Sequence, residues 1–174
     1  MIIFFLFLSY FLALLQATFF ANFNFFSLSI DIILITSLVI LFIGYRRQSL
    51  FFLIASIIFL SLFSSAPFVT LFFSYFFVFF PYIILEQQKI ISSPTVATSI
   101  IYFFLSVIVV NLFHIIFSAD LAPDFFYLLI ISALLNSIVG FLVYYLVNKV
   151  LVFYNPYVRD KKIKIITSKN KIDF

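Results

Sequence analysis

The sequence predicts an all-α membrane protein, a bundle of about six transmembrane helices with both chain ends in the cytoplasm. Three observations lead to this fold class. Hydrophobic residues make up 66% of the 174 residues and charged residues only 9%, whereas soluble domains contain about 25% charged residues. The apolar stretches have lengths near the ~20 residues that cross a bilayer. The basic residues fall in alternate connections between these stretches.

Six apolar stretches with short polar breaks fill a transmembrane domain over residues 1–154. The first stretch has no basic region before it, so we expect a retained helix and not a cleaved signal peptide. Pro67 interrupts the chain between the third and fourth stretches, which form either two full spans or one kinked hairpin. The spans are expected at about 2–21, 25–44, 49–65, 68–85, 95–117 and 125–153, followed by a basic tail over 155–174.

The placement of basic residues predicts the orientation of the bundle. Arg46 and Arg47 follow the second span, Lys89 follows the fourth, and Lys149 lies near the end of the sixth. The other six basic residues lie in the tail, and the connection over 120–124 is acidic. Because cytoplasmic loops carry the excess of Lys and Arg, the even-numbered connections and both termini are predicted to be cytoplasmic.

The tail carries the net charge of the chain. Its six basic residues against two aspartates give +4, and each basic residue near an anionic leaflet contributes about 1 kcal/mol of attraction. Anchoring at the membrane surface is the favoured interpretation, and binding of an acidic cytoplasmic partner is the alternative. Few aromatics occur there, so we expect no nucleic-acid binding. The basic residues expected at the membrane surface are Arg46, Arg47, Arg159, Lys161, Lys162 and Lys164.

Most catalytic chemistry is excluded by composition. The chain has no cysteine, one histidine and two glycines, which rules out thiol catalysis, zincin-type metal spacing and a glycine-rich phosphate loop. No serine has a nucleophile-elbow pattern. The sequence therefore predicts a protein that is not an enzyme and has no catalytic, metal or cofactor site. The 30 phenylalanines are interpreted as low-GC codon usage in preference to an aromatic ligand cage.

Asp31 is the one carboxylate expected within a span, near the outer end of the second. A charge in the membrane costs a few kcal/mol, and less toward the interface. Two compatible interpretations remain open. The carboxylate pairs with another helix or a partner protein, or it lies in the first turn of a helix starting near Ser29, where the helix dipole favours it.

Other polar residues follow helical spacings within the spans. Asn111 and His114 share a face of the fifth span, where an interhelical hydrogen bond is favoured over a ligand contact or proton relay. Ser132, Asn136 and Gly140 form a stripe on the sixth span that suits close helix packing or docking of a partner. The candidate packing or partner contacts are Gln16, Asp31, Pro67, Tyr75, Asn111, His114, Asn136 and Gly140.

Four short motifs, spread over most of the chain, resemble conserved stretches of a known family. They are Leu-Leu-Gln-Ala-Thr over 14–18, Asp-Ile-Ile-Leu over 31–34, Pro-Phe-Val-Thr-Leu-Phe-Phe-Ser-Tyr over 67–75 and Leu-Leu-Asn over 134–136. In their order along the chain they resemble the MreD family of rod-shape membrane proteins. Ile30 stands where that family usually has proline, and Ser61 where it often has aspartate.

The resemblance implies a non-catalytic scaffold of the cell-shape and wall-elongation machinery in the bacterial inner membrane. Its implied partners are a bitopic MreC-like protein, the actin-like filament that the tail would face, and the glycosyltransferase and transpeptidase that build the wall. The alternative is a substrate-binding membrane subunit of an energy-coupling-factor type vitamin transporter. Such a subunit needs polar groups that converge in a pocket.

Overall fold

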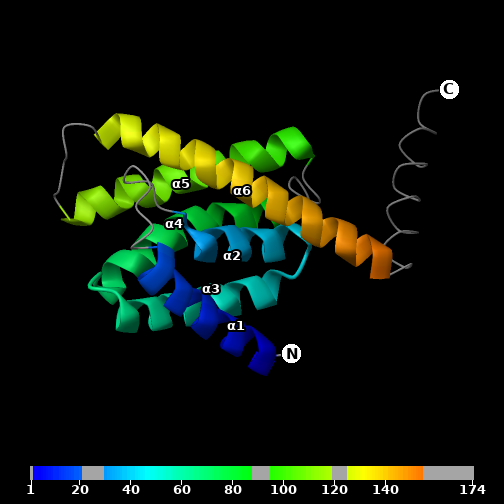
Figure 1. Ribbon diagram of the computed structural model, residues 1–174, viewed down its shortest axis with the longest axis horizontal. Coiled ribbons are helices and arrows are strands. Elements are labelled where there is room, and N and C mark those ends of the chain that lie inside the picture. Colours follow the sequence, from blue (N-terminus) through cyan, green and yellow to red (C-terminus); the bar gives the residue numbers. More distant parts are fainter. Residues whose placement is uncertain (1, 21–29, 88–94, 119–124, 155–174) are drawn as a thin grey trace.

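The computed structural model describes residues 2–20, 30–87, 95–118 and 125–154 (Figure 1). Over these residues the chain is entirely helical, which confirms the predicted all-α class. A five-residue π-helical segment, η1 (Gln16–Phe20), continues the first α-helix. The six α-helices are α1 (Ile2–Leu15), α2 (Ile32–Phe42), α3 (Arg46–Phe63), α4 (Phe68–Gln87), α5 (Val96–Ser118) and α6 (Phe125–Tyr154).

Four of the described helices, α3 to α6, are long and apolar enough to cross a membrane. The shortest of them has 18 residues, which rise about 27 Å at 1.5 Å per residue. Their length and composition indicate a membrane protein. The helix α2 has only 11 residues and rises about 16 Å, roughly half of the ~30 Å hydrocarbon core. A count of six full crossings stays a prediction.

The predicted second span, over 25–44, lies partly outside the described part of the chain, and its extent in the membrane stays a prediction. Residues 25–29 are not described, and the described helix starts at Ile32, with Asp31 as the N-cap that accepts a hydrogen bond from Leu34 N–H. An aspartate suits this position because its side chain satisfies one of the first N–H groups of the helix. After Phe42 the chain turns at Gly44, whose φ of 98° is the left-handed conformation that glycine adopts most easily.

The third and fourth predicted spans correspond to two separate helices, and whether each crosses the membrane fully stays a prediction. The helix α3 begins at Arg46, three residues before the predicted start, so Arg46 and Arg47 lie in its first turn and not in a loop. Pro67 directly precedes α4, and its carbonyl accepts the hydrogen bond of Leu71 N–H at 3.2 Å. Proline fits this position because the first N–H groups of a helix have no intrahelical partner.

The helices run roughly along the long axis of the molecule and alternate in direction (Figure 1). The beginnings of α1, α3 and α5 therefore share one end of the bundle with the last turns of α2, α4 and α6. We call this the basic end, because the three described Lys and Arg residues, Arg46, Arg47 and Lys149, belong to helix turns there. The side of the membrane that the basic end faces stays a prediction.

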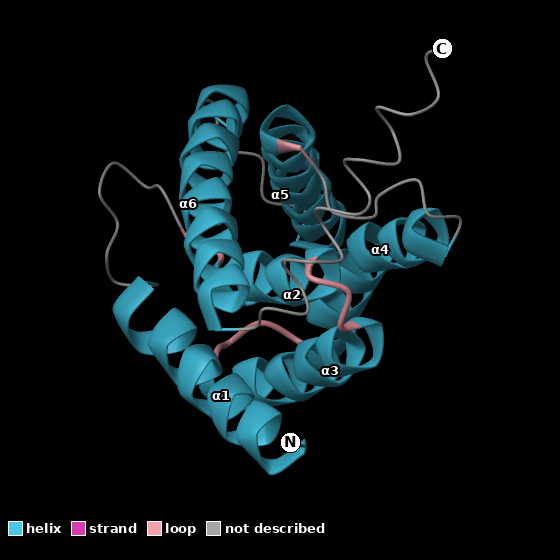
Figure 2. Cartoon of the chain, turned by 90° about the vertical axis from the view of Figure 1, so that its right-hand side faces the viewer, coloured by secondary structure: helices cyan, strands magenta, loops and turns pink. Residues whose placement is uncertain are grey.

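The short helix α2 lies at the centre of the bundle (Figure 2) and packs against all five other α-helices. A helix that is apolar on every side suits such a position, and eight of its 11 residues are buried. At its C-terminal end the ring of Phe42 lies 5.6 Å from that of Phe103 and 6.0 Å from that of Tyr144. These edge-to-face contacts join α2 to α5 and α6.

Candidate functional site

The N-terminal end of α2 lies inside the bundle, where side chains from other elements satisfy its backbone. Asp31 Oδ1 accepts from Leu34 N–H at 2.9 Å. The side chain of Gln16, from η1, accepts from Ile32 N–H at 2.9 Å. The side chain of Asn136, from α6, accepts from Asp31 N–H at 2.7 Å. The first N–H groups of a helix have no partner within the helix, so these contacts replace the water that a surface helix would use.

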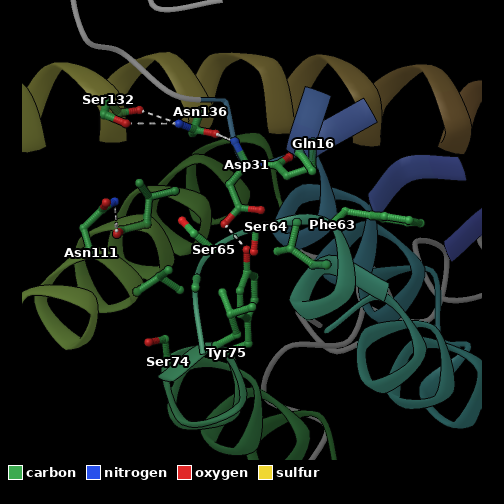
Figure 3. Close-up of a pocket in the computed structure, with 16 residues that line it drawn as sticks. Gln16, Asp31, Phe63, Ser64, Ser65, Ser74, Tyr75, Asn111, Ser132 and Asn136 are labelled. Atoms are coloured by element: carbon green, nitrogen blue, oxygen red, sulfur yellow. Dashed lines mark hydrogen bonds between the residues drawn. The ribbon is translucent and has the colours of Figure 1, made fainter. Parts of the chain in front are cut away.

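A second helix bonds the other oxygen of the Asp31 carboxyl group. The hydroxyl of Tyr75, on α4, donates to Asp31 Oδ2 at 2.7 Å (Figure 3). Asn136 is oriented in turn, because its Nδ2 donates to the carbonyl of Ser132 at 2.8 Å. Asn136 and Tyr75 are buried, and Asp31 is half-buried. Four segments of the chain are thus joined through one group of side chains, which we call the Asp31 cluster: Gln16, Asp31, Tyr75 and Asn136.

A cavity of about 420 Å³ adjoins the Asp31 cluster at the end of the bundle opposite the basic end (Figure 3). The end of α3, the start of α4 and facing parts of α5 and α6 complete its wall. Among the described residues that line this Asp31 cavity, only Asp31 and Tyr75 have an ionisable side chain. The polar lining residues are Gln16, Asp31, Ser64, Ser65, Ser74, Tyr75, Asn111, Ser132 and Asn136.

The structure brings together five of the eight residues proposed from the sequence as packing or partner contacts. Pro67 lies beside the cavity, one residue after the lining residue Ala66. His114 is on α5, and its side chain lies outside the described part. Gly140 lies elsewhere, on α6 against the ring of Phe103. The five residues that line the Asp31 cavity are Gln16, Asp31, Tyr75, Asn111 and Asn136.

The basic residues proposed for the membrane surface take no part in this site. Arg46 and Arg47 begin α3 at the basic end, and the tail residues Arg159, Lys161, Lys162 and Lys164 lie outside the described part of the chain. As one interpretation of Asp31 expected, its carboxyl group bonds another helix, through Tyr75. The other interpretation was wrong in its placement, because α2 begins at Ile32 and Asp31 is its N-cap and not a residue of its first turn.

The sequence did not single out Ser64 and Ser65 of the cavity wall, whereas Ser132 was expected in the stripe on the sixth span. Ser74 entered only as part of the motif over 67–75. The hydroxyl oxygen of Ser64 is buried and has no hydrogen-bond partner among the described residues. A serine within an apolar stretch commonly bonds its own helix, as Ser74 does with the carbonyl of Thr70 at 2.7 Å. Its presence in the sequence therefore does not tell which way it faces.

The chemistry of the site is that of hydrogen bonding around a single carboxyl group. In the described residues no group of three or more His, Cys, Asp or Glu side chains could hold a metal ion. Comparison of the chain with known protein families, with curated proteins and with solved structures finds no match.

Replacing Asn136 with alanine is expected to lower the free energy of unfolding by about 1–3 kcal/mol, because Asp31 N–H would be left buried without its acceptor. Ser137→Ala is the matched control. Ser137 is equally buried, at 1% exposure, but its hydroxyl donates only to a carbonyl of its own helix, that of Ala133. Thermal unfolding of both variants in detergent measures the difference. An equal effect of the two substitutions would contradict the role given to Asn136.

Proposed function

We propose that the chain is a non-catalytic membrane scaffold that resembles the MreD family and belongs to the bacterial machinery for cell shape and wall elongation. One observation carries the proposal. The four motifs that resemble the family lie far apart in the sequence, and each supplies one side chain to the Asp31 cluster: Gln16, Asp31, Tyr75 and Asn136. Their meeting in one cluster supports the resemblance.

The cluster supports a scaffold because its strongest polar contacts hold the bundle together. Asp31 and its partners link η1, α2, α4 and α6, so the relative placement of these elements is fixed by directional bonds. The outer surfaces remain apolar, as on α1, where Ile3 and Phe7 are 84% and 67% exposed. Helices associate in lipid through packing and hydrogen bonds, so a rigid apolar bundle suits docking of a bitopic membrane partner in the cytoplasmic membrane.

Deleting the gene in a rod-shaped bacterium that carries it is expected to produce round cells, because wall elongation would lose its membrane scaffold. Light microscopy of cell length and width measures the effect. Re-expression of the intact chain serves as the control and should restore rods. The tagged protein, purified in mild detergent, is also expected to retain a bitopic MreC-like protein. Cells that stay rod-shaped after deletion would contradict the proposal.

The Asp31 cavity is the specific observation that favours the second candidate, the substrate-binding subunit of a vitamin transporter. Its 420 Å³ falls within the ~300–1,000 Å³ of small-molecule sites. The two candidates differ in their partners. A transporter subunit would purify with coupling and ATPase proteins and support vitamin uptake, whereas the scaffold would purify with a bitopic protein and control cell shape.

A further inference from the structure

Three polar side chains that line the Asp31 cavity use hydrogen-bond donors within the protein. The hydroxyl of Tyr75 donates to Asp31. The hydroxyl of Ser74 donates to a carbonyl one turn earlier on α4, at 2.7 Å, and the amide nitrogen of Asn111 donates to a carbonyl one turn earlier on α5, at 2.9 Å. These three donors, from two different helices, are thus engaged with acceptors of the chain itself.

The same groups leave acceptor capacity toward the cavity. A carboxylate has about four lone-pair sites, and hydroxyl and amide oxygens have two each. Asp31 Oδ2 accepts from Tyr75 and can accept a second bond. The oxygens of Tyr75 and Ser74 and the Oδ1 of Asn111 are acceptors in the same wall. A cavity rich in acceptors is complementary to a ligand that brings several donors.

The charged groups around the cavity indicate the sign of the ligand's charge. No lysine or arginine is among its lining residues, and the described basic residues belong to the basic end of the bundle. The N-terminal dipole of α2, equivalent to about half a positive charge, offsets the carboxylate only in part. An anionic ligand would find no counter-ion in this wall, whereas a cation would complete the charge pairing that a carboxylate within a membrane protein requires.

A buried polar atom gives a second, independent indication of a ligand. Ser64 is among the residues that line the cavity, and its hydroxyl oxygen is buried and has no hydrogen-bond partner among the described residues. Figure 3 labels Ser64 together with Asp31 and Tyr75 among the side chains around the cavity. Buried polar groups are rarely left without a hydrogen bond, so a polar molecule in the cavity would complete this one.

We propose that the Asp31 cavity binds a primary ammonium group, with Asp31 Oδ2 as its counter-ion and the surrounding oxygens as acceptors for its remaining N–H bonds. An ammonium group combines positive charge with three donors, which matches this wall in both respects. The group can belong to the headgroup of an aminophospholipid or to a small soluble amine. The inference goes beyond the scaffold function and does not depend on it.

The test is equilibrium binding to the full chain purified in a detergent free of amines. In the lipid arm, native mass spectrometry compares phosphatidylethanolamine with phosphatidylcholine. In the soluble arm, calorimetry compares putrescine with its hexamethylated bis-quaternary analogue. The trimethylated partner of each pair keeps the charge and lacks the N–H donors. We expect the primary amine of one arm to bind at least tenfold more tightly than its methylated counterpart, and the arm in which it does so identifies the source.

Substitutions in the cavity wall test whether the amine binds in the cavity. Asp31→Asn is expected to weaken binding of the primary amine at least tenfold. Asn111→Leu removes an acceptor from the wall without leaving a buried donor unpaired, so it should fold normally and weaken binding severalfold. Tyr127→Phe, at a 69% exposed position on α6, is the control that should bind as the intact chain does. The proposal is overturned by no amine binding in either arm, by equal binding of the methylated analogues, or by unchanged binding in both cavity variants.

Discussion

Asp31→Ala is expected to lower the free energy of unfolding by about 1.5–5 kcal/mol. Two losses add up. The α2 helix loses its N-cap, which costs about 0.5–2 kcal/mol, and the Tyr75 hydroxyl, in a residue only 4% exposed, loses its acceptor, which costs about 1–3 kcal/mol. Denaturant or thermal unfolding in detergent, followed by circular dichroism, measures the change.

A double-mutant cycle separates these two contributions. Tyr75→Phe removes the hydroxyl that donates to Asp31, and the double variant with Asp31→Ala should be less destabilised than the sum of the single variants, since neither partner remains to be left unpaired. Asp31→Asn keeps an oxygen that can cap Leu34 N–H and should be milder than Asp31→Ala. Strict additivity of the two substitutions, or an Asp31→Ala protein as stable as the intact chain, would show that the carboxyl group does not join α2 to α4.

Gly140→Ala is expected to cost about 1–3 kcal/mol, the usual range for overpacking a well-filled interior, and Gly140→Leu is expected to cost more. A Cβ atom at Gly140 would lie 2.7 Å from two ring carbons of Phe103 on α5. The Phe103 side chain is 1% exposed and is held in turn by Phe42, so it has little room to move. Unfolding of the purified variants and the yield of folded protein measure the effect.

Making space on the opposite helix provides the control for this prediction. Phe103→Leu shortens the side chain that the new methyl group would meet, so the double variant with Gly140→Ala should recover part of the stability lost by Gly140→Ala alone. Ile138→Val, at a position on α6 that is 58% exposed, should be close to neutral. A Gly140→Ala protein with unchanged stability would mean that α5 and α6 do not approach as closely as the structure has them.

The helical fold could be predicted because apolar stretches and their polar breaks are visible in the sequence. The beginning of α2 could not be predicted in this way. The residues over 25–30 and those after Ile32 are similarly apolar, so hydropathy runs through Asp31 without a break. The described helix begins after Asp31, whose side chain accepts from Leu34 N–H. Two further bonds depend on other elements, because Asp31 N–H donates to Asn136 and Ile32 N–H donates to Gln16.

Most residues of the candidate site could be singled out from the sequence, but their meeting in one cavity could not be predicted. Polar side chains in apolar spans draw attention because burying them is costly without partners, and this singled out Gln16, Asp31, Asn111 and Asn136. Their meeting depends on the packing of α2 between α4, α5 and α6, for which sequence spacing within one helix carries no information. Ser64 and Ser74 gave no signal for the same reason, because a serine can bond its own helix wherever it faces.

The two glycines of the chain lie at positions where another residue type would be unfavourable. On α1 the small residues Ser9 and Ala13 are fully buried, both with 0% exposure. Gly44 turns the backbone at a φ of 98°, and Gly140 meets the Phe103 ring. Both glycines thus stand where a Cβ atom would be unfavourable, at Gly44 because of the backbone conformation and at Gly140 because of the Phe103 ring.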